Sequence, residues 1–226
     1  MSTLYVVGTP IGNLGDITFR AIEVLKSVDC ILCEDTRTTK ILLDKYGIAT
    51  ATLSYHSHSP TDKAEMVFAM LGEGKNLALV SDAGTPAISD PGSLLVSQVR
   101  ERFEDKVKIV AVPGPSALIS ALSISGLTGN QFTFFGFLPH KKGRESLFKE
   151  IADSKRPSVF YESPHRILKT LESLSKYAPD KKVTIARELT KIYEEVVSGA
   201  PSELLKFFGN NPDKARGEFV VIVGGE

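Results

Sequence analysis

The chain has 226 residues, which is enough for one large domain or for two domains of about 100 residues each. Hydrophobic residues make up 42% and charged residues 24% of it, a globular composition that excludes a disordered or fibrous protein. The 27 basic residues equal the 27 acidic ones, so any nucleic-acid surface must be local. No apolar run reaches the roughly 18 residues of a membrane helix and the N-terminus lacks a signal-peptide pattern, so we expect a cytoplasmic protein without a membrane segment.

Short apolar runs alternate with amphipathic stretches in the first half of the chain. The runs that predict strands are residues 4–7, 30–33, 77–80 and 107–112. Two helices are marked by a capping side chain followed by proline: Ser59-Pro60 precedes residues 61–71, and Asp90-Pro91 precedes residues 92–101. This alternation indicates an α/β domain with a mostly parallel sheet.

Cys30 and Cys33 have the C-x-x-C spacing that redox and zinc sites share. They lie in an expected buried strand, where residues three apart point to opposite faces. No second cysteine pair is present to complete a zinc site. We therefore expect two structural cysteines and no metal.

A proline-rich segment, Pro113-Gly114-Pro115-Ser116, interrupts the pattern and marks the domain boundary. We expect an N-terminal domain of residues 1–112, a linker of residues 113–116 and a C-terminal domain of residues 117–226, which opens with a helix over residues 117–125. Strands are expected at residues 132–137, 158–161, 183–188 and 219–223, and Ser163-Pro164 predicts a helix over residues 165–175. Because some of these strands are joined by short turns, we expect a mixed sheet.

Four Gly/Pro-rich loops follow the carboxyl ends of predicted strands or lie close behind them, at residues 8–16, 81–86, 89–92 and 113–116. Ligands of open α/β sheets bind beyond those strand ends. The loops match neither the dinucleotide fingerprint nor the P-loop, which argues against phosphate binding. Carbonyls, hydroxyls and carboxylates suit a positively charged sulfonium better. Any one of these loops alone is more often ordinary turn chemistry, and it is their convergence that favours a ligand site.

Long motifs of the chain resemble the tetrapyrrole methylase superfamily, and within it the branch that methylates ribosomal RNA. The motifs that carry the resemblance are residues 4–14, 33–37, 80–92, 112–117, 135–139, 160–166, 186–191 and 217–220. The resemblance implies a two-domain α/β methyltransferase, dimeric, with S-adenosylmethionine bound between the domains. Where corrin-making relatives have G-D-P, this chain has Gly84-Thr85-Pro86, a departure that argues against a tetrapyrrole substrate.

The resemblance also implies which residues contact the cofactor. Carried over by motif position, they are Pro10, Ile11, Gly12, Asp82, Gly84, Thr85, Pro86, Ile88, Ser116, Ala117, Tyr161 and Leu189.

A ribose hydroxyl must lose its proton when it is methylated, so a nearby base would assist. The catalytic candidates are Glu162, Glu188, Lys191 and His165. Beside Arg166 or Arg187, either carboxylate can equally be a salt-bridged part of the framework. His165 can be a local hydrogen-bonding group at a helix start, and Lys191 can contact phosphate instead.

A basic cluster follows Leu138-Pro139 and is the best candidate for phosphate contacts. The expected RNA-binding residues are Lys141, Lys142, Arg144, Arg166 and Arg187. A solvated surface turn is the alternative. Near the second strand, Asp35 can line the acceptor side of the cleft or simply cap a helix, with Arg37 exposed.

The resemblance implies an S-adenosylmethionine-dependent enzyme that methylates the 2′-hydroxyl of a cytidine in 16S rRNA of the small ribosomal subunit. Two alternatives remain open at this point. One is a methyltransferase that acts on a tetrapyrrole or another small molecule. The other is a non-catalytic RNA-binding factor in ribosome assembly.

Overall fold

The structure is a computed structural model that describes residues 1–56, 61–90, 92–127 and 130–225. The chain divides into two compact units, Met1–Ser116 and Ala117–Glu226, called unit 1 and unit 2 below. No helix in these described ranges is both long and apolar enough to cross a membrane.

Unit 1 is a parallel sheet with helices on both faces. Its elements are β1 (Ser2–Val7), α1 (Phe19–Ser27), β2 (Cys30–Cys33), α2 (Thr36–Lys45), β3 (Thr52–Ser54), α3 (Thr61–Gly72), β4 (Leu77–Leu79), α4 (Gly92–Phe103) and β5 (Val107–Val112). In the described part of unit 1 the five strands run in the order β3-β2-β4-β1-β5, and every neighbouring pair is parallel. The predicted parallel sheet is confirmed, and the carboxyl ends of its strands share one edge.

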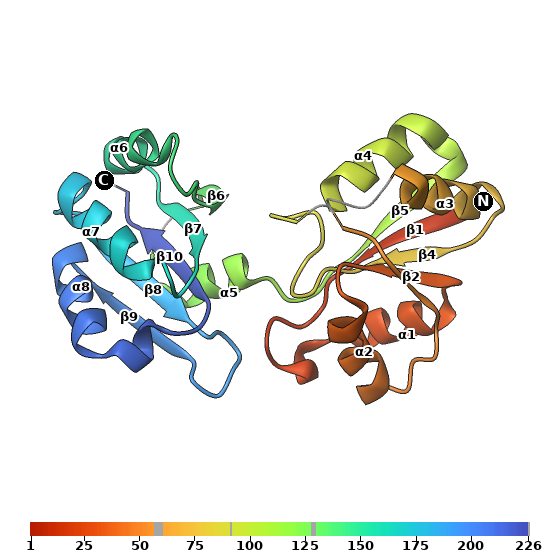
Figure 1. Ribbon diagram of the computed structural model, residues 1–226, viewed down its shortest axis with the longest axis horizontal. Coiled ribbons are helices and arrows are strands. Elements are labelled where there is room, and N and C mark those ends of the chain that lie inside the picture. The colour runs from red at the N-terminus through yellow and green to blue at the C-terminus, as the bar shows by residue number, and fades with distance from the viewer. Residues whose placement is uncertain (57–60, 91, 128–129, 226) are drawn as a thin grey trace. The chain divides into compact units, whose positions relative to one another are not determined.

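Alternating side chains divide between the two faces of this sheet. Val7 and Ile31 pack with residues of α1 and α2, whereas Leu4 and Leu32 pack with residues of α3 and α4 on the other face. Figure 1 shows α1 and α2 on one side of the sheet and α3 and α4 on the other. Each face is thereby buried, which explains why the strands read as continuous apolar runs. Cys30 and Cys33 are buried on opposite faces and unpaired with each other, as expected from their spacing.

Unit 2 is built on a mixed sheet. Its elements are α5 (Ala117–Ile124), β6 (Thr133–Phe137), α6 (Arg144–Asp153), β7 (Ser158–Glu162), α7 (Ile167–Tyr177), β8 (Val183–Arg187), β9 (Glu195–Gly199), α8 (Pro201–Asn210) and β10 (Phe219–Val223). The strand order is β6-β7-β10-β8-β9; β6 and β7 are parallel and the other pairs antiparallel. The expected mixed sheet is confirmed.

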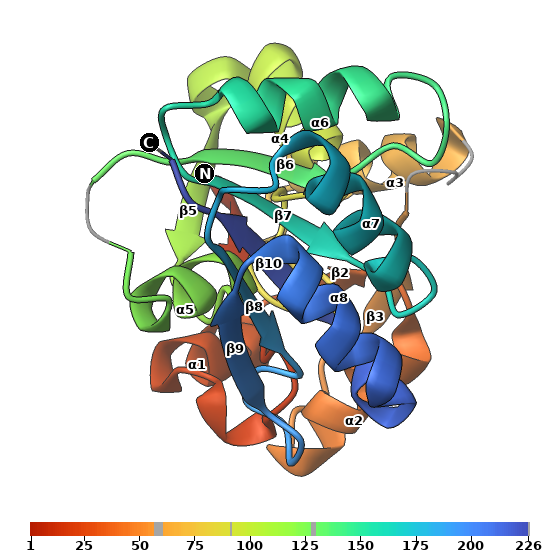
Figure 2. The same ribbon diagram turned by 90° about the vertical axis from the view of Figure 1, so that its left-hand side faces the viewer.

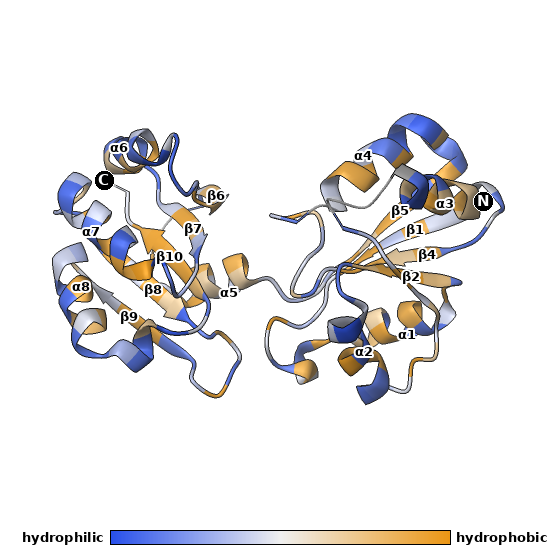
Figure 3. Cartoon of the chain, viewed as in Figure 1, coloured by the Kyte–Doolittle hydropathy of each residue, from blue (hydrophilic) through white to orange (hydrophobic). Residues whose placement is uncertain are grey.

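Helices α6, α7 and α8 cover one face of this second sheet, as Figure 2 shows. Phe160 and Val221 on that face are fully buried beneath Phe148 of α6 and Leu171 of α7. Figure 3 shows β10 as hydrophobic along its length, whereas α6, α7 and α8 carry hydrophilic residues on their outer sides. Helix α5 lies on the opposite face of the sheet from these three helices (Figure 2).

One helix and two short strands show the clearest differences from the sequence-based expectation. Helix α7 begins at Ile167 rather than at residue 165, because Pro164 and His165 form a turn in which the Ser163 carbonyl accepts the amides of Arg166 and Ile167. The short strands β3 and β9 were not predicted, since each carries polar residues at a sheet edge. The expected capping pair at residues 59–60, and the proline expected after Asp90, lie outside the described residues.

Candidate functional site

The loops after β1 and β5 touch through two glycines. The amide of Gly8 donates to the carbonyl of Val112 at 3.0 Å. A Cβ atom placed on Gly8 would lie 2.8 Å from the Cα of Gly114, closer than real Cβ atoms approach their neighbours. The two backbones can therefore cross only because neither residue has a side chain.

The loops after β1 and β4 are joined by a two-bonded bridge. Thr9 and Gly84 exchange backbone hydrogen bonds of 2.9 and 3.1 Å. The buried hydroxyl of Thr9 donates to the carbonyl of Ser81 at 3.1 Å. Gly84 has φ +81°, a conformation that favours glycine, and its Cα faces Ile11, whose Cγ2 would lie 3.3 Å from an added Cβ.

The loop after β4 is also tied to the loop after β5, because the hydroxyl of Thr85 donates to the carbonyl of Pro115 at 3.2 Å. The structure thus brings Ile11, Gly84 and Thr85, three of the expected cofactor residues, into one fixed loop cluster. Pro10 and Pro86 are buried in the same loops, while Gly12, Asp82 and Ile88 are exposed on them. We call the segments 8–12, 81–86 and 113–116 the loop cluster.

The turn at residues 87–90 carries backbone strain. Ala87 and Ser89 have φ of +69° and +66°, the left-handed region that residues with a Cβ rarely adopt. Asp90 holds the turn, since its Oδ1 accepts the amides of Ala87 and Gly92, each at 2.8 Å. Strain of this kind persists where the surrounding structure fixes it, and it is frequent at ligand sites.

Carboxylates gather at the same edge of the sheet. Asp82 accepts the amide of Asp35 at 3.2 Å, and burial raises the pKa of Glu34, with further contributions from the charges of Asp82 and Asp90. Asp35 also caps α2 by accepting the amide of Arg37, whose side chain is 89% exposed. The edge is therefore anionic, which suits a cationic ligand.

In unit 2, the carboxylate of Glu162 at the end of β7 is fully buried and paired with two guanidinium groups. Its Oε1 lies 3.2 Å from Nε of Arg166, and its Oε2 lies 3.7 Å from a terminal nitrogen of Arg144. The Thr170 hydroxyl donates to Oε2 at 2.6 Å, and the Ser163 amide donates to Oε1 at 2.8 Å. Both carboxylate oxygens are thus occupied by donors from this chain.

The turn after β8 holds the second carboxylate candidate. Glu188 has φ +51° and its Oε1 accepts from Nζ of Lys191 and from the amide of Glu218, each at 2.9 Å. Burial acts to raise the pKa of Glu188, but the hydrogen bonds from Glu218 and Lys191 outweigh it, so the pKa lies below its ordinary value. Burial likewise acts to lower the pKa of Lys191, and the bonds to the two carboxylates raise it overall.

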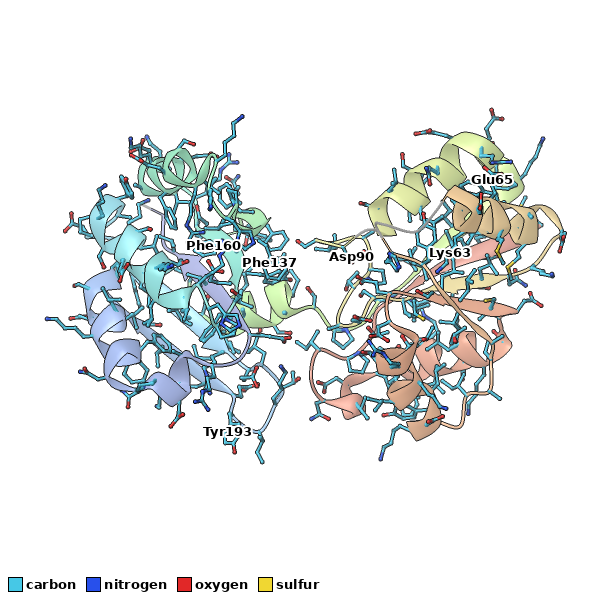
Figure 4. All side chains as sticks on the ribbon, in the orientation of Figure 1. Lys63, Glu65, Asp90, Phe137, Phe160 and Tyr193 are labelled. Atoms are coloured by element: carbon cyan, nitrogen blue, oxygen red, sulfur yellow. The ribbon has the colours of Figure 1, made fainter. Side chains whose placement is uncertain are left out.

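The arginine at the end of β8 is held by protein oxygens. Arg187 is 11% exposed, donates to the carbonyls of Arg216 and Tyr193 at 2.8 and 3.2 Å, and lies 3.7 Å from a carboxylate oxygen of Glu195. Tyr193 itself projects from the turn between β8 and β9, as Figure 4 shows.

Unlike Arg187, Lys141 and Lys142 are exposed, and the structure describes no ion pair for them.

The other expected residues of unit 2 have the following places. Tyr161 packs edge-on against Phe134, and burial raises its pKa, opposed by a hydrogen bond with the backbone of Leu118. Leu189 is buried and His165 is exposed. Ser116 ends unit 1 and Ala117 begins α5. Among the residues that the structure describes, no group of three or more His, Cys, Asp or Glu side chains is arranged to hold a metal ion.

Thr170 and Gly217 take part in these clusters and were not predicted to do so. Thr170 bonds both Glu162 and Arg144, and Gly217 faces Glu188, where an added Cβ would lie 2.5 Å from Cγ. The i,i+4 spacing of Glu162 and Arg166 was the available signal for the first cluster. Nothing in the spacing of Glu188 and Gly217 indicates the second.

Residues 3–205 match the sequence model of the family described as tetrapyrrole (corrin/porphyrin) methylases. Among similar proteins, a Vibrio cholerae protein named ribosomal RNA small subunit methyltransferase I is 48% identical over 98% of this chain and 77% of its own length. A Thermotoga maritima protein of the same name is 45% identical over the whole of both chains. The solved structure of a cobalt precorrin-4 methyltransferase of cobalamin biosynthesis shares the fold, with a TM-score of 0.68 at 16% identity over 98% of this chain and 94% of that one. The chain belongs to the tetrapyrrole methylase family.

Proposed function

We propose that this chain is an S-adenosylmethionine-dependent enzyme that methylates the 2′-hydroxyl of a cytidine in 16S rRNA of the small ribosomal subunit. The observation that carries the proposal is the 45–48% identity, over nearly all of the chain, to proteins named ribosomal RNA small subunit methyltransferase I. The structure shared with a precorrin methyltransferase supports the fold alone, because only 16% of residues are identical.

The loop cluster of unit 1 fits the chemistry of a sulfonium cofactor. The carboxylates of Glu34, Asp35 and Asp82 lie close together where β2 and β4 end, and Asp82 is exposed there. A cationic sulfonium and its amino group are attracted to such groups. We propose that Pro10, Ile11, Gly12, Asp82, Gly84, Thr85, Pro86 and Ile88 contact the cofactor. Contacts from Ser116, Ala117, Tyr161 and Leu189 remain predictions.

Held by residues 10–12 and 82–88, S-adenosylmethionine would supply an activated methyl group for transfer to the ribose oxygen. The contribution of the protein is then mostly alignment. The rigid crossing at Gly8 and Gly114 and the bridge at Thr9 and Gly84 are suited to that purpose, because they fix the loops before any ligand arrives.

The four base candidates differ in how well their surroundings suit proton removal. Glu162 is fully buried with both oxygens occupied, and Lys191 has a raised pKa that keeps it protonated at neutral pH. Glu188 has a lowered pKa, which makes it a weak base. We therefore propose that Lys191 contacts a phosphate as a cation, and that the ribose proton leaves to solvent or to exposed His165.

RNA contacts are proposed at Lys141 and Lys142, whose ammonium groups face solvent. Arg144, Arg166 and Arg187 are engaged with protein oxygens, so their contribution to RNA binding is proposed to act mainly through the loops that they hold. We also propose that the enzyme is a cytoplasmic homodimer, as the family resemblance implies.

Transfer of tritiated methyl groups from S-adenosylmethionine to small ribosomal subunits that lack the modification tests the proposal. Label recovered in 16S rRNA, absent when fully modified subunits are supplied, is the expected result. Calorimetric titration with S-adenosylmethionine measures cofactor binding alongside this transfer assay. No binding at millimolar cofactor would overturn every methyltransferase proposal, whereas cofactor binding without label in rRNA would favour a small-molecule acceptor.

A further inference from the structure

The buried carboxylate of Glu162 is linked to the basic loop through two arginines. Glu162 follows Phe160 on the face of β7 that α6 and α7 cover, and Phe160 lies inside unit 2, as Figure 4 shows. Arg144, the first residue of α6, and Arg166, the residue before α7, approach the carboxylate from two different elements. Their side chains are 16% and 14% exposed, so both are largely withdrawn from solvent.

Each arginine uses its remaining donors on the backbone that leads into the basic loop. Arg166 donates to the carbonyl of Leu138 at 2.6 Å, and Arg144 donates to the carbonyl of Pro139 at 3.2 Å. A nitrogen of Arg166 also lies 3.5 Å from Nε2 of His140. These bonds fix the chain immediately before Lys141 and Lys142, and the turn closes where the amide of Arg144 donates to the carbonyl of Lys141 at 3.2 Å.

The carboxylate is what allows the two guanidinium groups to share this position. Burial lowers the pKa of Arg144, and the nearby charge of Arg166 lowers it further, whereas Glu162 opposes both effects. Without the negative charge, two partly buried cations would repel each other at low dielectric. Thr170 completes the arrangement, since its hydroxyl donates to Glu162 and accepts from Arg144 at 2.7 Å.

We infer that Glu162 is a positioning residue for RNA recognition: through Arg144 and Arg166 it holds residues 138–143 in the conformation that presents Lys141 and Lys142 to the phosphates of the rRNA. Glu162 acts through these arginines and touches neither substrate nor cofactor. That the ligand is rRNA rests on the proposed function. That Glu162 holds residues 138–143 rests on the hydrogen bonds and ion pairs described above.

The test is Glu162→Gln, which keeps the shape of the side chain and removes its charge. We expect backbone amides of residues 138–144 to exchange hydrogen about tenfold faster, and affinity for unmodified small ribosomal subunits to fall about tenfold, the equivalent of 1.4 kcal/mol. Affinity for S-adenosylmethionine should stay within about twofold, because Tyr161 and Glu162 face opposite sides of the strand. Thr170→Val removes one hydrogen bond to Glu162 and one to Arg144, so it should produce the same changes more weakly. This variant replaces Glu162→Gln in the test if Glu162→Gln does not fold.

The matched control is Glu145→Gln on α6, which breaks the exposed pair with Lys149 and should change none of these quantities. Unchanged exchange in residues 138–144 of the Glu162 variant would overturn the inference. Faster exchange with unchanged subunit affinity would also overturn it, leaving Glu162 a purely structural residue. If the unsubstituted protein does not bind subunits, the proposed function is overturned instead. The two failures can be told apart because this one is seen without any variant.

Discussion

Gly8 and Gly114 cross backbone against backbone at the carboxyl ends of β1 and β5. A Cβ atom on Gly114 would lie 2.8 Å from the carbonyl oxygen of Gly8, so any side chain at either position must push the two loops apart. The crossing fixes the loop after β1 against the loop after β5, and the Thr9–Gly84 bridge fixes it against the loop after β4. The proposed cofactor residues of unit 1 depend on these two contacts for their positions.

Replacing Gly114 with alanine tests the crossing. We expect Gly114→Ala to lower the free energy of unfolding by about 1–3 kcal/mol, as overpacking does, and to weaken S-adenosylmethionine binding. Urea unfolding and calorimetric titration measure the two effects. Gly209→Ala in α8 is the control, because nothing lies within 4 Å of a Cβ there. Equal cofactor affinity in Gly114→Ala and the unsubstituted protein would show that the crossing does not position the cofactor loops.

The bond between Thr85 and Pro115 gives a second prediction. Thr85→Val retains the shape of the side chain but removes the donor to the Pro115 carbonyl, which should cost about 1 kcal/mol of stability. Thr85→Trp should crowd the loop cluster and weaken cofactor binding more strongly while the protein remains folded. Calorimetry with S-adenosylmethionine and circular dichroism measure these results. An unaltered dissociation constant in the tryptophan variant would place the cofactor elsewhere.

The Glu188–Lys191 pair predicts a pH dependence of stability. Because the pKa of Glu188 is lowered in the folded protein, the charged carboxylate stabilises the fold at pH 7, and this stabilisation is lost as the pH falls below about 4.5 and through the folded pKa. The raised pKa of Lys191 has the opposite sign, so its contribution is present below about pH 10.5 and is lost as the pH rises through the folded value. Urea unfolding of Glu188→Gln should thus differ from that of the parent most at neutral pH. A difference that grows in acid would contradict the assignment.

Charge reversal of the exposed lysines tests the phosphate contacts. Lys141→Glu with Lys142→Glu should weaken binding to small ribosomal subunits and reduce the slope of log affinity against log salt by about 2, one for each lost phosphate contact. Affinity for the cofactor should not change. Lys26→Glu with Lys45→Glu, exposed residues of α1 and α2, alters the net charge equally and is the control. If both double variants show the same salt slope, Lys141 and Lys142 are ordinary surface residues.

Much of the fold was predictable because buried strands have an unmistakable composition. Residues 30–33, 107–112 and 219–223 were predicted with the bounds that the structure shows, since each run is flanked by polar or turn residues. Strand β9 was not predicted because its buried positions are few: Val196 and Ser198 are exposed, and Glu195, Val197 and Gly199 are only partly buried. An edge strand of this kind has a weak pattern until its neighbour β8 is known.

The candidate site was predictable only in part. The loops after the parallel strands were identified from glycine, proline and strand position, and Thr85 lies among them as expected. The convergence of Arg144 on Glu162, by contrast, depends on how α6 and β7 pack, and no local pattern encodes it. The left-handed conformations of Ala87 and Glu188 could not be predicted from the sequence either, because neither residue type favours them.

The identity of the methylated nucleoside is the most direct test of the proposed function. Small ribosomal subunits lacking the modification are incubated with the protein and S-adenosylmethionine, and the 16S rRNA is digested to nucleosides and analysed by mass spectrometry. The proposed function predicts one new product, 2′-O-methylcytidine, in stoichiometric amount. A nucleoside methylated on its base, or rRNA without any new methyl group, would contradict it.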